Sequence, residues 1–293
     1  MLIKIQSFIN NLFKTILSLL KIILLTRRVQ KLHPADNKRT CTILGNGPSL
    51  LSTLEKKPTF LSDSSLLCVN FFADTDLYEK FQPERYVINA PEIWRKNCAE
   101  VYLTNQKELF HTISNKTNWT LLLYLPVNAR NSEFYKKTIS PILVQNENIK
   151  VCFFNVTPIE GFKFLIFPLF RRNLGMPRPH NVLIPSLMIT INSGFEEIFL
   201  LGADHSWLKD IWVDENNAVF LRQRHFYQND PTPKEMHKRG TGTRRLHEVL
   251  QKFVYTFSGY FILKDYVEKR GVRIINATPG SYIDAFERYP NNS

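Results

Sequence analysis

The sequence predicts an α/β protein, with a Rossmann-like, mostly parallel sheet, helices on both of its faces, and an amphipathic N-terminal helix. Strand-like apolar runs alternate with helix-like segments from residue 41 onward, which is typical of a parallel sheet. The chain has 293 residues, 44% of them hydrophobic, so it can fill a large core. We expect residues 1–38 to form a helix and a linker, and residues 39–293 to form one α/β domain.

Residues 1–25 have the period of an amphipathic helix with a wide apolar face. Its polar side chains share one stripe: Lys4, Ser7, Asn11, Lys14, Ser18 and Lys21. The lysines interrupt the apolar run too often for a membrane span, and no cleavage site of small residues follows, as a signal peptide requires. We expect the helix to lie in a membrane interface, apolar face down, with its cations toward anionic head groups. The alternative is a helix packed on the main domain or on a partner.

Apolar runs and helical periods divide the rest of the chain into elements. The predicted strands are Cys41–Leu44, Leu66–Asn70, Arg85–Asn89, Trp119–Leu125, Lys150–Phe154, Glu197–Leu201 and Val272–Asn276. The clearest helices are Val182–Asn192, Arg244–Tyr255 and Phe261–Lys269. Residues 161–179 are basic and aromatic with several prolines, so we expect a loop or lid near the ligand or membrane there, or a plain surface connection with a buried aromatic edge. A short helix is predicted from Tyr282 to Tyr289.

Charge and cysteine usage limit the possible partners. The formal net charge of +12 means that the surface attracts anions such as nucleotides, phospholipids or nucleic acid. Nucleic acid is disfavoured, because the basic residues are spread along the chain without a zinc-finger, helix-turn-helix or aromatic RNA-binding pattern. The cysteines, Cys41, Cys68, Cys98 and Cys152, show no metal-ligand spacing, and all but Cys98 lie in strand-like runs. Reduced core thiols of this kind favour a cytosolic location.

A glycine turn, Gly45-Asn46-Gly47-Pro48-Ser49-Leu50, follows the first predicted strand. Two glycines flanking an amide let the backbone approach a phosphate or a ribose closely, and the next residues suit the first turn of a helix, whose free N–H groups favour an anion. The turn lacks the third glycine of a dinucleotide fingerprint and the lysine of a P-loop. An ordinary strand-turn-helix connection is the alternative. The expected nucleotide contacts in this turn are Gly45, Asn46, Gly47 and Ser49.

Polar residues recur at the carboxyl ends of the predicted strands, where open parallel sheets bind ligands. Asn46, Asn70 and Asn89 follow or close the first three strands, and Asp204 and His205 follow the strand Glu197–Leu201. An asparagine both donates and accepts hydrogen bonds, so three of them around one pocket suit a pyrimidine edge and ribose hydroxyls. The alternative is that each asparagine merely makes a turn.

The residues around these asparagines carry a resemblance to a known family. The segments are Gly45–Leu50, Cys68-Val69-Asn70-Phe71-Phe72, Val87-Ile88-Asn89-Ala90-Pro91 and, more loosely, Gly194–Asp204. They resemble bacterial sialyltransferases of glycosyltransferase family 42, where the motif asparagines hold the CMP part of CMP-sialic acid. The glycine turn also resembles putative nucleotide-dependent transferases similar to 6-hydroxymethylpterin diphosphokinases. The resemblance implies a Rossmann-like transferase domain, a variant of the GT-A type.

Two segments depart from that family. Its serine-glycine helix start, which touches the donor, is replaced by Pro179-His180-Asn181-Val182, and the aromatic residues after its glycine-aspartate strand are replaced by His205-Ser206-Trp207. Since those tyrosines assist the leaving phosphate in the family, either Tyr227 or nearby arginines take over here, or the donor differs. His180 and Asn181 are candidates for donor contact at a helix start, with structural capping as the alternative.

Sugar transfer with inversion needs a base for the acceptor hydroxyl and polar or cationic groups for the departing phosphate. Histidine is the natural base near neutral pH. The candidates are His205, His225, His237 and His247. We favour His225, because the segment 222–227 combines it with Arg222, Arg224 and Tyr227. His205 is the rival, because it and Asp204 directly follow a strand.

Two further features are ambiguous. Asp74-Thr75-Asp76 has the spacing by which many nucleotide-sugar transferases hold manganese. The resembled family needs no metal, so we interpret these carboxylates as an acidic pair at a helix N-terminus and expect no metal site. The turn Asn276–Ser281 either closes over the nucleotide or ends the sheet.

The sequence thus predicts a membrane-associated bacterial glycosyltransferase on the cytoplasmic face of the cell membrane. The resemblance implies transfer of sialic acid or a related sugar from a CMP-linked donor to a cell-surface glycan, with no cofactor besides the donor substrate. The expected partners are donor, glycan acceptor and, through residues 1–25, the membrane surface. Two alternatives stay open: a metal-dependent, diphosphokinase-like phosphotransferase centred on Asp74, Asp76 and Asp204, or a non-catalytic nucleotide- or lipid-binding protein.

Overall fold

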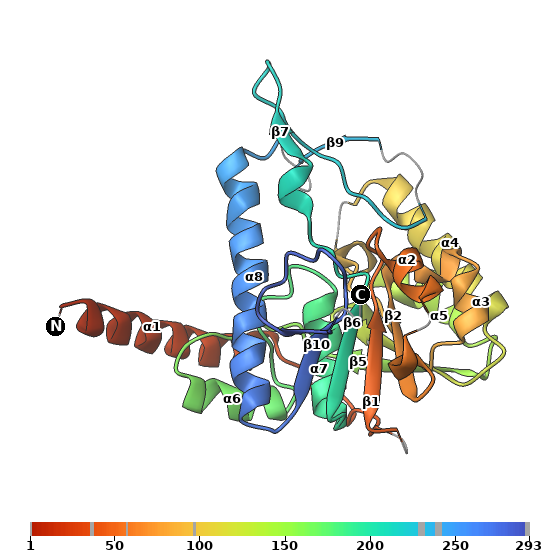
Figure 1. Cartoon of the computed structure of the whole chain (residues 1–293), viewed down its shortest axis with the longest axis horizontal. Coiled ribbons are helices and arrows are strands. Elements are labelled where there is room, and N and C mark those ends of the chain that lie inside the picture. The colour runs from red at the N-terminus through yellow and green to blue at the C-terminus, as the bar shows by residue number, and fades with distance from the viewer. Residues whose placement is uncertain are drawn as a thin grey trace.

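The computed structural model describes residues 2–35, 38–56, 58–95, 98–227, 232–237 and 242–290. Its centre is an eight-stranded sheet in the order β11-β10-β6-β1-β2-β3-β4-β5 (Figure 1). All neighbouring pairs in this sheet are parallel. The strands are Thr40–Leu44 (β1), Ser64–Val69 (β2), Arg85–Val87 (β3), Leu121–Pro126 (β4), Ile149–Phe154 (β5), Glu197–Leu201 (β6), Arg273–Asn276 (β10) and Glu287–Arg288 (β11). The predicted Rossmann-like sheet is confirmed, and each predicted strand is present in it.

Helices cover both faces of the sheet, and each face has its own apolar core. The first core is closed by α6 (Lys163–Arg171), α7 (Leu183–Ser193) and α8 (Leu246–Glu268). The second is closed by α2 (Leu50–Glu55), α3 (Leu77–Phe81), α4 (Glu100–Lys116) and α5 (Ser140–Leu143). Side chains of one strand alternate between the cores: in β1, Cys41 and Ile43 lie in the first and Leu44 in the second.

Single turns complete the connections. The 3₁₀ turns are Thr59–Leu61, Asn70–Asp74, Pro91–Ile93, Ala129–Asn131 and Trp207–Lys209, and a π turn spans Tyr135–Ile139. A second, antiparallel sheet consists of β7 (Ile211–Val213), β8 (Val219–Leu221) and β9 (Lys234–Glu235). It forms the projection at the top of Figure 1. The sequence did not predict it, because strands of two or three residues are too short to show an alternating pattern.

Three expectations about helices were wrong. The two helices predicted over 244–269 are one helix, α8, which runs through Gly259. The glycine is tolerated there because its missing side chain admits Ile184 of α7, whose Cδ1 would lie 3.1 Å from an added Cβ. The loop expected over 161–179 contains α6, because Ile166, Phe167 and Phe170 share one buried face.

The third wrong expectation is the helix from Tyr282 to Tyr289. This segment is irregular and ends in β11. Its backbone bonds elsewhere, since the N–H of Tyr282 donates to the carbonyl of Asp204 (2.8 Å) and the N–H of Ile283 donates to Ser281 Oγ (3.2 Å). Tertiary hydrogen bonds therefore override the local helical pattern.

The N-terminal helix α1 (Leu2–Leu25) projects from the body of the molecule (Figure 1). It packs on the domain through its polar side: Thr15 and Ser18 are its buried residues, and Ser18 Oγ donates to the carbonyl of Glu160 (2.8 Å). The sequence placed this stripe toward water or head groups, so that detail was wrong. By length and composition alone, α1 is long and apolar enough to cross a membrane.

Replacing Gly45 with alanine tests the contact at the centre of the sheet. An added Cβ would lie 2.4 Å from the carbonyl oxygen of Gly202, which is backbone and cannot give way cheaply. We expect Gly45→Ala to lower the free energy of unfolding by about 2–4 kcal/mol, because overpacking and strain add. The measurement is urea denaturation followed by circular dichroism.

The control is Gly259→Ala, where the nearest atom is the flexible end of Ile184 and the backbone is helical. There the helix propensity of alanine favours the variant by up to about 1 kcal/mol. Equal stability of the two variants would contradict the packing described for the ends of β1 and β6.

Candidate active site at the carboxyl edge of the sheet

The candidate site lies where the strand order reverses. After β1 the chain continues to β2 on one side, and β6 joins β1 on the other side. Connections diverge at such a switch point, and open α/β sheets bind ligands there. The turn after β1 and the segment after β6 touch along their backbones: the N–H of Gly45 donates to Leu201 and that of Gly47 to Gly202, both at 2.8 Å.

The close approach of these two segments explains why glycine occupies positions 45 and 47 in the turn after β1 and position 202 after β6. An added Cβ on Gly47 would lie 1.9 Å from the Asp204 carboxylate, and Gly202 has a φ of +61° with its own Cβ position 2.6 Å from the Gly45 carbonyl. The glycines therefore serve the packing of β1 against β6. The expected contacts of Gly45, Gly47 and Ser49 with a phosphate or ribose stay a prediction.

The anion expected at the start of α2 is present, and it is Asp204. Its Oδ2 accepts a hydrogen bond from Ser49 Oγ (2.9 Å), and its Oδ1 accepts one from the Ser49 N–H (3.3 Å). Burial raises the pKa of Asp204, while these hydrogen bonds oppose the rise. A carboxylate in this position disfavours a phosphate beside Gly47 and Ser49.

The three predicted asparagines lie at this edge, where hydrogen bonds connect the strand ends that carry them. Asn46 Nδ2 donates to the carbonyl of Val69, next to Asn70 (3.1 Å). Asn70 Oδ1 accepts the N–H of Asn89 (3.4 Å), and Asn89 Nδ2 donates to the carbonyl of Pro179 (3.4 Å). Asn70 adopts a left-handed backbone (φ +48°), which asparagine tolerates better than most residues.

His180 and Asn181 follow Pro179 and directly precede α7. Asn181 Oδ1 accepts the N–H groups of Leu183 (2.8 Å) and Ile184 (3.2 Å), so this residue caps the helix as the sequence allowed. The His180 ring stacks on Tyr255 of α8 with centroids 5.4 Å apart. Burial, followed by the charges of nearby cations, lowers the pKa of His180.

Buried amide atoms in this group lack partners. Asn46 Oδ1 and Asn181 Nδ2 are both shielded from solvent and make no hydrogen bond to any described residue. The Tyr260 hydroxyl lies near Asn181. Burial raises the pKa of Tyr260, and the nearby Asn181 side chain opposes this rise. The two groups do not have the geometry of a hydrogen bond. A buried polar atom without a partner costs about 1–3 kcal/mol, so each of these two atoms calls for a hydrogen-bonding group from a water molecule or a ligand.

His205 follows β6 and lies close to Asn181, because both side chains approach the Tyr260 hydroxyl. Its Nε2 and the Tyr260 hydroxyl form a hydrogen bond of 2.6 Å, and its ring stacks on Trp207 with centroids 4.2 Å apart. Burial lowers the pKa of His205 to about 3, so the ring is neutral at physiological pH. Tyr260 was not among the predicted site residues, because a tyrosine on a helix is usually part of the core.

The segment 222–227 reaches the asparagines through its backbone. The N–H of Phe226 donates to the carbonyl of Asn46 (3.1 Å), and the His225 and Tyr227 rings stack with centroids 5.2 Å apart. Burial, and then the charge of Asp74, raises the pKa of Tyr227, which keeps its phenol protonated.

The arginines of this segment differ. Arg224 pairs with Asp210 at 2.9 Å, whereas Arg222 lies over the Trp212 ring at 6.0 Å from its centroid. The Nε of Arg222 is buried and has no hydrogen-bond partner among the described residues. The Nε–H of Arg222 can therefore donate a hydrogen bond to a further group such as a ligand oxygen.

The other candidates lie outside this group. His247 is on α8, as predicted, and His237 pairs with Glu235 of β9 at 3.7 Å. Burial raises the pKa of Asp74, Lys116 opposes this, and Asp76 directly precedes α3. Within the described part of the chain, no three histidine, cysteine or acidic side chains gather as a metal site would require.

The turn Asn276–Ser281 closes against the end of β6. The N–H of Ala203 donates to Thr278 Oγ1 (3.0 Å), and Ser281 Oγ donates to the Ala203 carbonyl (2.6 Å). These two bonds hold the backbone of Ala203 and so help to position Asp204 and His205, which follow it. The sequence left its role open, because two hydroxyls in a turn have no distinctive pattern.

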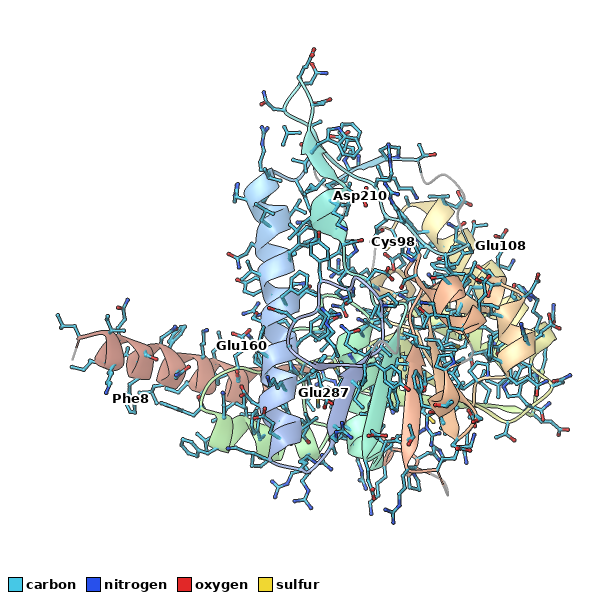
Figure 2. All side chains as sticks on the ribbon, in the orientation of Figure 1. Phe8, Cys98, Glu108, Glu160, Asp210 and Glu287 are labelled. Carbon is cyan, nitrogen blue, oxygen red and sulfur yellow. The ribbon has the colours of Figure 1, made fainter. Side chains whose placement is uncertain are left out.

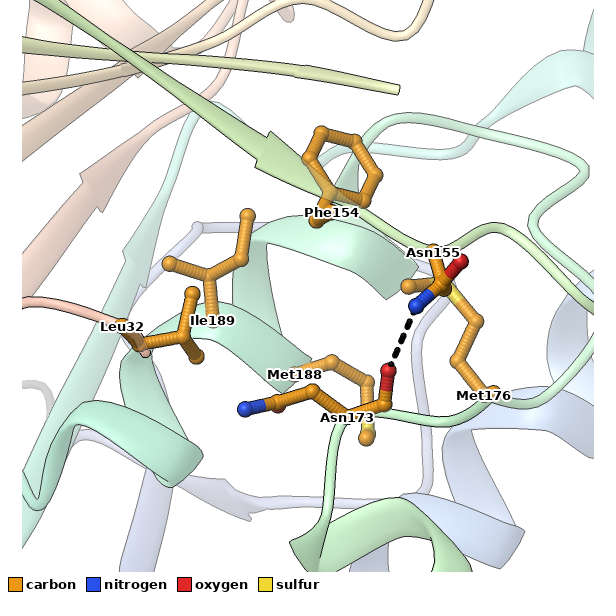
Figure 3. A pocket seen from close by; sticks show the side chains of 8 residues that line it. Leu32, Phe154, Asn155, Asn173, Met176, Met188 and Ile189 are labelled. Carbon is orange, nitrogen blue, oxygen red and sulfur yellow. Dashed lines mark hydrogen bonds between the residues drawn. The ribbon is translucent and has the colours of Figure 1, made fainter. Parts of the chain in front are cut away.

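A narrow pocket lies elsewhere, below the linker that follows α1 (Figure 3). Leu32, Phe154, Met188 and Ile189 line it, with the Asn155 amide bonded to the carbonyl of Asn173 (3.0 Å) at one side. It has room for about one water molecule and is therefore too small for a nucleotide.

Comparisons with known proteins were made by family, by sequence and by structure. No protein-family model matches the chain, and no curated protein matches it. Among solved structures, the chain is similar to the MAf glycosyltransferase from Magnetospirillum magneticum AMB-1, with a TM-score of 0.49 and 11% sequence identity. The match covers 93% of this chain and 37% of that one, so this protein spans little more than a third of its neighbour.

The neutral state of His205 predicts a pH dependence of stability. Because its pKa is about 3 in the fold and about 6.5 in an unfolded chain, the unfolded state takes up the proton first as the pH falls. The stabilisation is complete above pH 6.5 and is lost between about pH 6.5 and 3. In this range we expect the free energy of unfolding of the parent to fall more steeply with falling pH than that of His205→Gln. The reason is that unfolding of the parent takes up to one proton more. The measurement is urea denaturation of both proteins at several pH values, and parallel curves would refute the buried neutral ring.

Proposed function

We propose that the protein is a glycosyltransferase whose nucleotide-activated donor binds at the switch point between β1 and β6. The observation that carries this proposal is a pair of buried amide atoms, Asn46 Oδ1 and Asn181 Nδ2, that have no hydrogen-bond partner among the described residues. One atom needs a donor and the other an acceptor, as a pyrimidine edge with ribose hydroxyls provides. The resemblance of the asparagine segments to CMP-using sialyltransferases makes a CMP-linked sugar the first candidate donor.

The charges set the direction of the donor. The Asp204 carboxylate beside Gly47 repels phosphate, so the nucleoside lies on the asparagines and its phosphate points toward the segment 222–227. There the Nε of Arg222 has no partner among the described residues, and Tyr227 keeps its phenolic proton. Both groups are suited to a departing phosphate.

In the proposed transfer, the acceptor hydroxyl oxygen attacks the anomeric carbon of the sugar. A bond forms between these atoms, and the bond from the anomeric carbon to the donor phosphate oxygen breaks. The nucleotide leaves with the electron pair, and a base takes the proton of the hydroxyl. His225 is the proposed base. His205 is less suitable, because its Nε2 is engaged by Tyr260 and its pKa is about 3.

The proposed acceptor is a cell-surface glycan, such as a polysaccharide or lipooligosaccharide, met at the cytoplasmic face of the membrane. The apolar helix α1 supports a peripheral membrane association. The buried, unpaired cysteines and the soluble donor support the cytoplasmic side.

A panel of donors tests the proposal. The purified chain is incubated with CMP-, UDP- and GDP-sugars and with ATP, with and without a divalent metal, and release of free nucleotide is measured. We expect release from one sugar nucleotide, CMP-linked first, without dependence on metal. Hydrolysis of ATP alone, dependent on magnesium, would instead identify a phosphotransferase.

Loss of the proposed base should affect turnover and spare donor binding. With the donor found by the panel, we expect His225→Ala to lower kcat by about 10²–10⁴, because that is the usual contribution of a general base. His111→Ala, on the exposed face of α4, is the matched control and should keep parental turnover. If His205→Ala abolishes turnover while His225→Ala does not, the base is at the end of β6.

Loss of the amide at Asn46 should have the opposite effect. We expect Asn46→Ala to raise the Kd of the donor about 5- to 100-fold with little change in kcat, because a buried partner is worth about 1–3 kcal/mol. Asn216→Ala, in the exposed turn between β7 and β8, is the control. Isothermal titration calorimetry with the free nucleotide measures the affinity of both variants. If Asn46→Ala binds the nucleotide as tightly as the parent, the nucleotide does not bind at this turn.

A further inference from the structure

The helix α1 is attached to the domain by its polar side, which is the reverse of helix packing in a soluble core. Ser18 Oγ donates to the carbonyl of Glu160 and accepts the Glu160 N–H, both at 2.8 Å. Thr15 Oγ1 accepts the N–H of Phe162 (3.0 Å). Gly161 (φ +130°) lies so close that an added Cβ would be 2.1 Å from Thr15 Oγ1. The turn 160–162 therefore fixes the rotation of α1 about its axis.

The outward side of α1 is apolar along its full length. Its exposed large hydrophobic residues are Leu2, Ile3, Ile5, Phe8, Ile9, Leu12, Phe13, Ile16, Leu17, Leu19, Leu20, Ile23, Leu24 and Leu25. Figure 2 labels Phe8 on the half of the helix that projects from the domain. Water is an unfavourable environment for so large a continuous apolar face, so another apolar phase covers it.

The same apolar surface continues onto the start of α6. The Phe8 ring contacts the Phe162 ring, with centroids 5.3 Å apart, and Phe162 contacts Phe164 at 5.6 Å. Phe164 is 69% exposed and Leu165 is 42% exposed. We call the outward side of α1 together with Phe162, Phe164 and Leu165 the lipid-facing surface.

The attachment of α1 excludes a membrane span in this arrangement. Residues from Asn11 to Ile22 contribute to the docked stripe, whereas residues 2–10 are exposed and touch the domain through the Phe8 ring. Those residues make a helix about 14 Å long, while a bilayer core is about 30 Å thick. A helix attached in this way can lie along the interface but cannot cross the bilayer.

The charge of this region matches an anionic surface. Residues 1–35 contain no aspartate or glutamate, and their cations are Lys4, Lys14, Lys21, Arg27, Arg28 and Lys31. Lys14 lies 4.0 Å from Glu160, and Arg178 pairs with the same carboxylate. Burial alone would raise the pKa of Glu160, but the contacts with Arg178 and Lys14 outweigh it and lower the pKa. Lys21 is half-buried and its charge also acts on Glu160. The other four cations, Lys4, Arg27, Arg28 and Lys31, are exposed and can meet lipid phosphates.

We infer that α1 and the start of α6 form a single monotopic contact with an anionic bilayer, in which Phe162, Phe164 and Leu165 enter the interface together with the helix. This inference rests on the membrane association proposed above and adds its topology and a second membrane-contacting element. The contact between Glu160 and Ser18 then sets the orientation of the domain on the membrane. A second copy of the chain is the competing cover for the same surface.

The first experiment measures binding of the full chain to phosphatidylcholine vesicles with and without phosphatidylglycerol. We expect salt-sensitive binding to the anionic vesicles, and Phe164→Ser/Leu165→Ser should weaken it about tenfold, since two partly inserted side chains are lost. The matched control is Val101→Ser/Val144→Ser, which removes exposed apolar side chains from α4 and the end of α5 on the other face of the sheet. If both double variants bind the vesicles equally well, α6 takes no part in the membrane contact.

The second experiment determines the topology. A protease-cleavable tag is placed at the N-terminus, and protease is added outside vesicles carrying the bound protein. We expect complete cleavage, because a monotopic helix keeps both ends on the side of the domain. A tag protected until detergent is added means a span and overturns the inference alone. A chain that ignores all vesicles and forms stable dimers through α1 overturns the membrane association as well.

Discussion

The close contact between the ends of β1 and β6 is the constraint on which the rest of the site depends. Gly45 and Gly202 bring their backbones within a distance that no side chain would allow. The Asp204 carboxylate then reaches Ser49 at the start of α2 and closes the contact. The glycine turn, which in sequence looks like a phosphate cradle, therefore joins the two halves of the sheet.

With that contact closed, the proposed ligand site lies on the asparagine side of the edge. Hydrogen bonds join Asn46 to the Val69 carbonyl, Asn70 to the Asn89 N–H and Asn89 to the Pro179 carbonyl, and the N–H of Phe226 donates to the Asn46 carbonyl. Polar groups linked in this way are held rigidly, which is what selective binding requires. The unpartnered amide atoms are consistent with a site organised before its ligand arrives.

Much of the fold follows from the sequence, because long apolar strands and their polar ends have a clear period. The strands, their parallel pairing and the shared edge of the asparagines were all predicted in this way. Features that depend on distant partners were not. Gly259 looks like a break in a helix until Ile184 is known to face it, and the turn after Tyr282 looks helical until Asp204 takes its N–H.

The orientation of α1 is a second such case. Its polar stripe is evident in the sequence, but whether that stripe faces water or protein depends on the turn 160–162, far along the chain. The role of Asp204 is a third, since a helix start favours any anion and the sequence does not say that the chain supplies its own. Both depend on long-range contacts, which local patterns do not contain.

A crystal structure of the chain with a bound pyrimidine nucleotide tests the central claim most directly. The account predicts that the base or ribose donates a hydrogen bond to Asn46 Oδ1, and that the phosphate lies toward Arg222 and Tyr227, away from Asp204. A phosphate bound at the N–H groups of Gly47 and Ser49, with Asp204 displaced, would contradict it.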